Sequence, residues 1–597
     1  MSTRTVFTLL EEAVERYGSA PALHQPLPGG KHRSYNWVEY RTTVQEIACG
    51  LRSLGIQRGD IVGLHSETRA EFYMADLGVI SNGSIAAALY TSYPVHEQVR
   101  TLEACGPKAV FVENPKSLKA LREAASSLNV TWILMSGTAD GTMTLEELAA
   151  LGRKALDEAP TAFDRIHAEV RPEDHAILYL TSGATGEPKM GLVSHRAILA
   201  NADMGPEVIE LGPEDATIAF LPSAHITQRF VMEIFMIRMG VPVWFSEGLS
   251  RLPHEMRSVR PTFLVAPPRV WERIFASIST EIRKRGTVSR RLFYTAVGVG
   301  AEAYRYTLDG KPLPIWISAS MKLFDKVMFR KIRERLGGRV RVAVSGAAPL
   351  GKELAAFYAA IGMPLIEGYG LTEGGVLVFN PVSRPKLGSI GKPLPGVELK
   401  IAEDGELLVK SPTLFDGYYK DPEATAAVLR DGWLYTGDIA EIDDEGYVYI
   451  TGRKKEVIVA SNGKKIYPAR VETLFKVEPI VNQVFVLGDR MPYAAALFTL
   501  NMAAVEAIIG AERAKSLTLD DIAKLPEIQK EVKEAVQRAN KQLAPFEQIR
   551  KFRILDREFT IDSGEMTPTM KLRRAKVLEN FQPVISDIYA GKEEAAL

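Results

Sequence analysis

The chain of 597 residues is too long to fold around one hydrophobic core, so we expect two or three domains. Lys plus Arg and Asp plus Glu both number 73, which excludes a global positive field of the kind that attracts nucleic acid. Two cysteines, Cys49 and Cys105, exclude a disulfide framework, and their spacing is not that of a metal site. With no signal-peptide pattern and no apolar run long enough to span a bilayer, these features predict a cytoplasmic protein.

The chain up to Ala159 alternates between two hydrophobic periods. Apolar residues at helical spacing predict helices over residues 6–17, 37–54, 70–82 and 145–159. Short apolar and β-branched runs predict strands over residues 60–65, 109–112 and 130–134. Strands that alternate with helices indicate a layered α/β fold around a parallel sheet.

A loop rich in glycine and hydroxyl side chains follows the apolar run of residues 176–180. Its candidate phosphate donors are Thr181, Ser182, Gly183, Thr185, Gly186 and Lys189. Glycines let backbone N–H groups turn toward a phosphate, hydroxyls add donors and a lysine adds charge. The loop is not a Walker A motif, because Pro188 replaces its glycine and Met190 its Ser or Thr. The pattern predicts a strand that delivers an anion-binding loop, and an ordinary surface turn is the alternative.

The middle of the chain continues the same alternation. Strands are predicted over residues 218–222, 263–266 and 340–344, and the run 364–373 is typical of a strand that opens into a second Gly/Thr/Glu loop. Residues 325–336 predict a helix with a cationic face. A solvated helix surface is the usual reason for such a face, and binding of a nucleotide or lipid phosphate is the alternative.

The pattern changes after Gly388. Short alternating runs up to Tyr449, broken by Gly, Pro and Asp, predict a small antiparallel β region. The last 141 residues, 457–597, have strands of their own and helices predicted over residues 503–509 and 520–543, so they indicate a separate, smaller domain.

Five motifs occur in a fixed order along the chain. They are residues 181–189, Tyr-Gly-Leu-Thr-Glu at 369–373, Tyr-Thr-Gly-Asp at 435–438, Gly-Arg at 452–453 and Pro-Thr-Met-Lys at 568–571. Together they resemble the adenylate-forming superfamily of acyl-CoA synthetases, adenylation domains and luciferases, from about residue 20 to residue 575. Runs at 221–229, 261–269, 332–349 and 567–571 are similar to those of long-chain fatty acyl-CoA synthetases.

The resemblance implies the fold and the reaction. The fold would be a large N-terminal layered α/β domain with a small β-barrel-like part (residues 1–452), a hinge (453–456) and a mobile small α+β domain (457–597). The reaction would be ATP-dependent activation of a long-chain fatty acid to acyl-AMP with release of pyrophosphate, then transfer to coenzyme A, with Mg²⁺ as cofactor. A fatty substrate partitions into bilayers, so peripheral contact with the inner face of a membrane is compatible with this function.

The sequence leaves other functions open. Within the superfamily, a fatty acyl-AMP ligase would hand the acyl group to a carrier protein. The acid could also be medium-chain, aryl or bile-acid-like, because function depends on the pocket rather than the fold. A non-catalytic acyl-nucleotide sensor is the alternative of another class, and a luciferase-like activity would need light emission.

The resemblance also assigns roles to residues. Lys571 would bridge the carboxylate and the α-phosphate, Thr372 would bind the α-phosphate, Glu373 would hold Mg²⁺, and Lys189 would bind phosphates. Asp438 would accept from the ribose hydroxyls, and Arg453 would reach the ribose. The adenine would lie among Gly346, Ala347, Ala348, Gly368, Tyr369 and Gly370.

Three further residues concern the acyl group and the second step. His225 would border the acyl pocket, Lys455 would be the hinge, and Gly463 would let a pantetheine arm approach the backbone closely. Two residues depart from the family pattern. Ala184 lacks a hydroxyl donor found there, and Met190 stands where the family has glycine, so we expect it to limit the approach of the backbone to phosphate.

Overall fold

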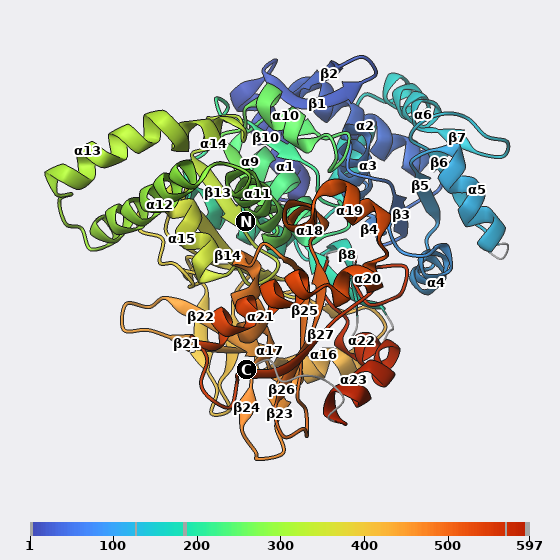
Figure 1. Ribbon diagram of the computed structural model, residues 1–597. Coiled ribbons are helices and arrows are strands. Elements are labelled where there is room, and N and C mark those ends of the chain that lie inside the picture. The colour runs from blue at the N-terminus through green and yellow to red at the C-terminus, as the bar shows by residue number, and fades with distance from the viewer. Residues whose placement is uncertain (1–3, 126–127, 183–187, 568–569, 591–597) are drawn as a thin grey trace.

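The computed structural model describes residues 4–125, 128–182, 188–567 and 570–590. Figure 1 shows the blue and green elements of the first half of the chain in the upper part of the picture, whereas most orange and red elements lie lower and α18 (Met502–Ile509) and α19 (Ala511–Ser516) overlap the upper part. The α/β architecture that the sequence predicts, with a large N-terminal part and a small C-terminal part, is confirmed. Cys49 and Cys105 are free cysteines, and both are buried.

A mixed sheet lies at the centre of the first half of the chain, with the strand order β7-β6-β5-β3-β4-β8-β9-β19 among the described residues. Its strands are β3 (Ile61–His65), β4 (Ile85–Ala88), β5 (Ala109–Val112), β6 (Thr131–Leu134), β7 (Met143–Thr144), β8 (His175–Ser182), β9 (Pro188–Ser194) and β19 (Gly417–Tyr418). From β7 to β8 all neighbours are parallel, whereas β9 and β19 join in antiparallel orientation. The parallel arrangement predicted for the strands up to residue 134 is confirmed, and β9 and β19 extend the sheet beyond them because β8 and β9 form a hairpin.

Helices cover both faces of this sheet. On one face α4 (Val95–Cys105) and α5 (Pro115–Ala124) pack on buried strand residues such as Val110 and Leu178. On the other face α1 (Val6–Tyr17), α2 (Trp37–Ser53) and α3 (Ala70–Ser81) contribute to the largest apolar cluster, and α6 (Leu145–Glu158) contacts α2. The four predicted helices of this region are thus confirmed within one residue at each end.

Two further sheets complete the large part. One has the order β12-β13-β14-β15-β16, with β12 (Phe263–Ala266), β13 (Val342–Ser345), β14 (Leu365–Leu371), β15 (Gly375–Phe379) and β16 (Lys392–Pro393). Its first three strands are parallel, and α11 (Pro268–Arg283), α12 (Thr287–Leu308) and α15 (Lys352–Ala360) enclose a core with it around Trp271 and Tyr358. The other sheet has the order β10-β11-β1-β2, with β10 (Thr217–Ala219), β11 (Val243–Phe245), β1 (Pro21–Leu27) and β2 (Lys31–Asn36).

The predicted small antiparallel region is confirmed. It consists of β17 (Glu398–Ile401), β18 (Glu406–Lys410), β20 (Leu429–Arg430), β21 (Trp433–Ile442) and β22 (Val448–Arg453), all in antiparallel pairs. A short 3₁₀ turn, η4 (Lys454–Glu456), follows β22 directly. The chain then enters the C-terminal part.

The C-terminal part has apolar clusters of its own, built from side chains between Ile458 and Tyr589. Its sheet is β25 (Val481–Leu487), β26 (Ala494–Leu500) and β27 (Ile549–Ile554), and its helices include α17 (Pro468–Thr473), α18 (Met502–Ile509), α19 (Ala511–Ser516), α22 (Arg574–Asn580) and α23 (Gln582–Tyr589). The single helix predicted over residues 520–543 is wrong. It is divided into α20 (Leu519–Lys524) and α21 (Pro526–Asn540), because Pro526 has no N–H to continue the first helix and starts the second.

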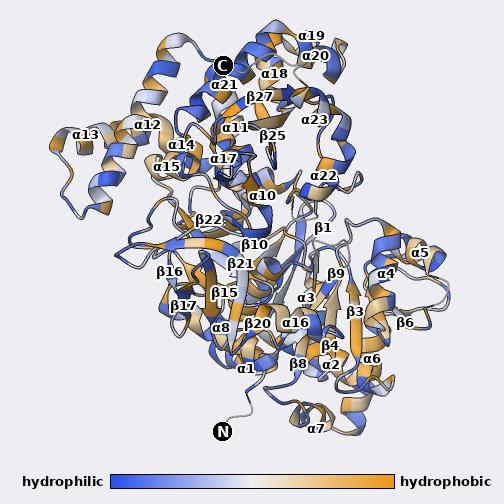
Figure 2. Ribbon diagram, turned by 90° about the horizontal axis from the view of Figure 1, so that it is seen from below, coloured by the Kyte–Doolittle hydropathy of each residue, from blue (hydrophilic) through white to orange (hydrophobic). Residues whose placement is uncertain are grey.

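A pair of helices projects from the large part (Figures 1 and 2). The chain turns at the end of α12 and returns in α13 (Ile315–Phe324). A π-helical turn, η3 (Asp325–Phe329), joins α13 to α14 (Arg330–Glu334), so the predicted helix 325–336 is the second half of a helical run that begins at Ile315.

Candidate functional site

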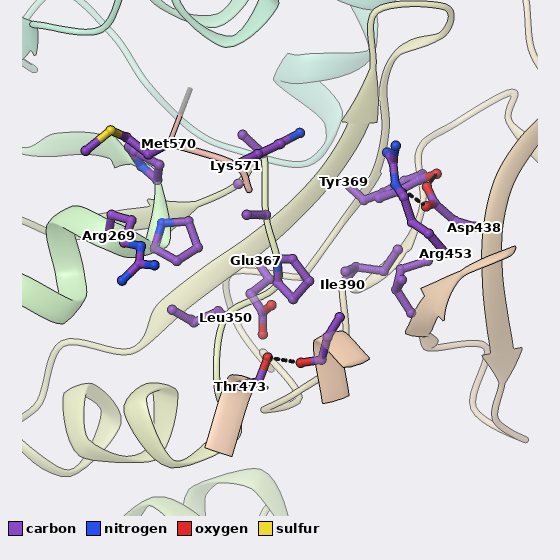
Figure 3. Close-up of a pocket in the computed structure, with 18 of the residues that line it drawn as sticks. Arg269, Leu350, Glu367, Tyr369, Ile390, Asp438, Arg453, Thr473, Met570 and Lys571 are labelled. Atoms are coloured by element: carbon purple, nitrogen blue, oxygen red, sulfur yellow. Dashed lines mark hydrogen bonds and ion pairs between the residues drawn. The ribbon is translucent and has the colours of Figure 1, made fainter. Parts of the chain in front are cut away.

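A cleft of about 3130 Å³ lies between the large part and the C-terminal part. The ends of β13, β14, β21 and β22 line it from one side, and residues of the segments 469–484, 564–567 and 570–576 line it from the other. Figure 3 shows Lys571 extending toward the side of the cleft where Tyr369, Asp438 and Arg453 lie. Most residues that the sequence singles out therefore meet in one place.

Three of these residues form a hydrogen-bonded group. Asp438 on β21 and Arg453 on β22 are cross-strand partners, and Arg453 Nε lies 3.0 Å from Asp438 Oδ1. The Tyr369 hydroxyl, from β14, donates to Asp438 Oδ2 at 2.6 Å. Asp438 is buried while the Arg453 side chain is half exposed, so the carboxylate is held rigidly and the guanidinium faces the cleft. Burial, followed by the nearby Asp438, raises the pKa of Tyr369 well above its ordinary value.

A second group surrounds Glu373, which follows β14. The Tyr418 hydroxyl donates to Glu373 Oε1 at 2.7 Å, and Lys189 Nζ lies 4.7 Å from the centre of the Tyr418 ring. Tyr418 on β19 pairs with Gly191 on β9, and this register brings the aromatic ring beside Lys189. Tyr418 could not be found from the sequence, because its contact with Glu373 depends on a pairing between strands more than 200 residues apart and no local motif marks it.

The glycine-hydroxyl loop connects β8 and β9. Thr181 pairs with Lys189 and Ser182 with Pro188, so both ends of the loop belong to a hairpin. Gly183, Thr185 and Gly186 lie outside the described residues, as does Ala184. Lys189 lines the cleft, and Thr372 lines it beside Glu373.

The expected effect of Met190 is wrong. Successive strand residues point to opposite faces of a sheet, so Lys189 faces the cleft and Met190 faces away from it. Its sulfur lies 3.6 Å from Cys105 Sγ, in the cluster between the sheet and α4. Met190 therefore fills the core and does not limit the approach to the phosphate side of the cleft.

The predicted adenine site lies where β13 ends and β14 passes it. A Cβ on Gly346 would lie 3.4 Å from the Gly368 carbonyl oxygen, which is van der Waals contact, so the two segments lie side by side. Ala347 has a φ of 69°, a left-handed conformation that is costly for alanine and often found at ligand sites. Ala348 and Gly370 line the same cleft.

Lys571 enters the cleft from the C-terminal part. Its backbone N–H donates to Thr567 Oγ1 at 3.1 Å, and Met566 and Leu572 form an isolated bridge, so both sides of this segment are held together. Burial of the amine, followed by the repulsion of Arg453, lowers the pKa of Lys571 to about 8, although Asp438 and Glu373 oppose the shift. The amine is thus close enough to both acidic groups of the cleft to feel their charge.

His225 stands at the entrance of an apolar section of the cleft. The Thr227 N–H donates to its Nδ1 at 3.2 Å, so Nδ1 carries no proton and a neutral ring has its proton on Nε2. Burial and the charge of Lys571 lower the pKa of His225 to about 3, which keeps the ring neutral. The apolar lining beyond it is Val208, Ile209, Ile226, Phe230, Val231, Phe235, Phe263 and Val265.

A π-helical segment, η2 (Thr227–Ile234), supports that apolar wall. Arg229 is completely buried and donates through Nε to Asp76 Oδ2 at 2.7 Å, which ties η2 to α3. Gln228 donates to the Tyr73 hydroxyl at 2.7 Å. Nothing in the motif at residues 221–229 marks Arg229 as a buried anchor.

Several contacts between the two parts lie away from the reacting groups. Lys476 Nζ lies 3.2 Å from Glu272 Oε1 on α11 and also donates to the Pro349 carbonyl oxygen. Arg269 donates to the Asn482 carbonyl oxygen at 2.6 Å. Arg283 on α11 lies 3.2 Å from Glu531 on α21. These polar contacts join the two parts in the orientation that the structure shows.

The two residues that the sequence assigns to the second step lie apart from this assembly. Lys455, in η4, lines the cleft at the junction of the two parts. Gly463 has a φ of 78° and lies in a separate depression with Val459, Ala460, Ser461, Asp489 and Arg490. The structure does not bring Gly463 to the Lys571 cleft.

Comparisons with known proteins cover both parts of the molecule. Residues 10–419 match the model of the AMP-binding enzyme family, and residues 455–593 match the AMP-binding enzyme C-terminal domain. Long-chain-fatty-acid–CoA ligase FadD15 of Mycobacterium tuberculosis is 34% identical over 581 residues, which cover 95% of this chain and 94% of that protein. Long chain acyl-CoA synthetase 7, peroxisomal, of Arabidopsis thaliana is 30% identical over 605 residues, 93% of this chain and 82% of that protein.

Among solved structures, the anthranilate CoA ligase AuaEII in complex with anthranoyl-AMP has a similar fold, with a TM-score of 0.75. The similarity covers 98% of this chain and 99% of that one at 19% identity. This likeness concerns the fold alone, and it extends over the large part and the C-terminal part together.

Proposed function

The chain belongs to the AMP-binding enzyme family and is an adenylating acid–thiol ligase, and from that premise we propose that it joins a long-chain fatty acid to coenzyme A. One observation supports the proposal most directly. A carboxylate suited to accept hydrogen bonds from ribose hydroxyls, a carboxylate suited to hold a cation beside the phosphates, and a lysine from the C-terminal part all line one cleft. They are Asp438, Glu373 and Lys571. An apolar section beyond His225 adds room for an acyl chain.

In the first step, a carboxylate oxygen of the acid attacks the α-phosphorus of ATP, and the bond to the leaving pyrophosphate breaks. Both reactants are anions, so catalysis depends on positive charge and donors aimed at the phosphate oxygens. Lys571 would stand between the attacking carboxylate and the α-phosphate, and Thr372 would donate to the latter. Lys189 would bind the phosphates that leave.

Mg²⁺ fits this site through Glu373. Mg²⁺ in nucleotide enzymes is usually held by one or two carboxylates together with phosphate oxygens and water. No group of three His, Cys, Asp or Glu side chains in the described part of the chain is arranged to hold a metal. Tyr418 fixes Glu373 through Oε1 and leaves Oε2 without a hydrogen bond to the described residues, so one oxygen is available. When bound, the ion would neutralise charge that develops on the phosphates.

In the second step, the sulfur of coenzyme A attacks the acyl carbon of the adenylate and AMP leaves. The amine of Lys571 occupies the cleft in the present arrangement, so a thiol needs a different one. We propose that the C-terminal part rotates about Lys455, within residues 453–456, and that Gly463 then borders the channel for the pantetheine arm. Hinges of this kind are a few residues at the ends of elements that absorb the change in backbone dihedrals.

The apolar wall favours a fatty acid over a polar one. A chain of methylene groups gains about 0.8 kcal/mol for each one buried, so an apolar section of this kind selects for chain length. The neutral His225 would present its Nε2 proton at the mouth of that section. The curated relatives named as long-chain ligases support the same substrate class.

Two half-reactions test the proposal separately. Pyrophosphate release is measured with Mg-ATP and saturated acids of increasing length, and thioester is measured after coenzyme A is added. We expect acid-dependent pyrophosphate and acyl-CoA, both best with long chains. Pyrophosphate without thioester would instead indicate a carrier-protein acceptor, and a folded protein that releases none would leave the non-catalytic sensor.

A further inference from the structure

The helical run from Ile315 to Glu334 carries a second apolar face that no part of the described chain covers. Its inner face packs into the core through Ile317, Phe329 and Ile332. On the outer face, Ile315 is 89% exposed and Trp316 is 61% exposed. Folding accounts for the inner face alone, because exposed apolar side chains gain nothing from the fold.

The exposed apolar residues are arranged in a row. Ile315, Ala319, Leu323 and Val327 follow one another at intervals of four, and such residues lie on one side of a helix. Leu323 is 59% exposed and Val327 is 45% exposed. The row therefore continues from α13 through the π-helical turn.

Cations lie directly beside this row. Lys322, Lys326 and Arg330 also recur at intervals of four, and each of the two lysines precedes an exposed apolar residue. The run contains five Lys and Arg residues against one Asp and one Glu, in a chain whose total charge is balanced. Lys322 and Lys326 form no ion pair with any described residue, whereas Arg330 pairs with Glu334. The face thus offers positive charge that the fold does not neutralise.

We propose that this face, the outer side of residues 315–330, docks the enzyme on the surface of an anionic lipid bilayer. A helix that lies in a membrane interface combines an apolar side, which enters the headgroup region, with lysines that attract anionic lipids. Trp316 fits this position, because indole prefers the boundary between water and acyl chains. No described helix is long and apolar enough to cross a membrane, so the contact is one of adsorption.

A second copy of the chain fits the face less well. A symmetric contact would place the same lysines opposite one another, and like charges repel at such a distance. Figures 1 and 2 show α13 projecting from the rest of the large part, which lets a flat surface reach it. The inference deepens the proposed function, because a long-chain acid dissolves in a bilayer and this face would hold the enzyme where its substrate is.

The test is binding to vesicles in the absence of ATP and acid, so that it does not depend on activity. The purified enzyme is mixed with phosphatidylcholine vesicles with and without phosphatidylglycerol, and bound protein is measured by flotation. We expect binding that requires the anionic lipid and weakens with salt. The double variant Lys322→Gln with Lys326→Gln should bind the anionic vesicles about 25-fold more weakly, because each cation near an anionic surface contributes roughly fivefold. Ile315→Ser with Trp316→Ser should weaken it at least about tenfold.

Matched controls separate the face from general effects. Leu249→Ser removes another exposed apolar side chain, 54% exposed, from a different part of the surface. Lys530→Gln with Lys541→Gln removes two exposed cations from the C-terminal part. Both control variants should bind as wild type does. The lysine substitutions concern exposed side chains and leave the inner face intact, so they test the proposal even if the Ile315/Trp316 variant folds poorly.

Three results of the vesicle experiment would overturn the proposal. They are absence of wild-type binding to anionic vesicles, equal binding of the face variants and wild type, and equal losses in the controls. A lipid-free dimer in sedimentation velocity that Trp316→Ser abolishes would also overturn it and assign the face to a second copy. A separate failure of acyl-CoA synthesis would refute the proposed function and leave vesicle binding unaffected.

Discussion

The orientation of the C-terminal part is expected to depend on Lys476, which touches no reacting group. Its amine pairs with Glu272 at 3.2 Å and donates to the Pro349 carbonyl oxygen. Replacement of this residue by methionine keeps the length of the side chain and removes the charge. If the observed orientation is the one that makes the adenylate, Lys476→Met should slow pyrophosphate release and leave thioester formation from supplied acyl-AMP unchanged or faster.

The contacts set the size of the effect. A hydrogen bond from a charged donor contributes about 1.5–3 kcal/mol, and an ion pair near the surface adds up to about 1 kcal/mol. The Lys476 and Glu272 side chains are 20% and 10% exposed, so screening reduces the ion-pair contribution only in part. We take about 2 kcal/mol in total, which shifts the equilibrium between orientations about 30-fold. Glu272 keeps its ion pair with Arg269 through Oε2 at 3.2 Å, so the loss of Lys476 does not leave its charge unpaired.

Single-turnover kinetics measure the two half-reactions apart. One experiment follows pyrophosphate release from acid and Mg-ATP, and the other follows acyl-CoA from acyl-AMP and coenzyme A. Lys530→Met, on the exposed side of α21, is the control for a lost lysine and should affect neither. Equal slowing of both steps by Lys476→Met, or pyrophosphate release at the wild-type rate, would refute this reasoning.

Three other predictions concern the cleft. Lys571→Ala should reduce pyrophosphate release about 100-fold or more, because a group aimed at the transition state contributes about 3 kcal/mol, and it should spare thioester formation from supplied acyl-AMP. Burial lowers the pKa of Lys571 to about 8, so kcat/KM of wild-type adenylation should fall as the pH rises through that value. A flat pH profile would count against this role. Lys455→Pro should allow adenylate formation and block thioester formation, since proline fixes φ, and equal loss of both steps would argue against a hinge there. Burial raises the pKa of Glu367 from 4.5 to about 8, so the contribution of this group to stability is full below pH 4.5 and is lost as the pH rises to about 8. The Tm of Glu367→Gln should therefore rise relative to that of wild type over this window. A difference in Tm that does not depend on pH would refute this prediction.

Local patterns were sufficient for helices and for the order of the motifs. The helix predicted over residues 6–17 has the same bounds in the structure, and α2 begins at Trp37 because Asn36 and Glu39 form a capping box that the sequence contains. The break at Pro526 shows the limit of periodicity, because the apolar spacing continues through a residue that cannot continue the helix.

Contacts between distant segments could not be predicted in this way. Tyr418 reaches Glu373 because β19 pairs with β9, and nothing near residue 418 encodes that partner. The position of Met190 depends on β9 being a strand at all, whereas its Pro and Gly neighbours favour a loop. The face at Trp316 was also missed, since an apolar residue at helical spacing is expected in a core and only the packing shows which side of the helix is free.

The division of the site between two parts of the molecule explains how one cleft would serve two reactions. Asp438 and Tyr369 belong to strands of the large part and hold each other in place, so they would keep the nucleotide fixed through both steps. Lys571 belongs to the part that we propose to move. Its positive charge would assist only the first step, in which the carboxylate of the acid approaches the α-phosphate of ATP. A lysine on the fixed strands would remain opposite the acyl carbon and obstruct the thiol. The cost of burying the amine, which the lowered pKa reflects, therefore opposes the present orientation, and contacts such as that of Lys476 with Glu272 would offset it until pyrophosphate leaves.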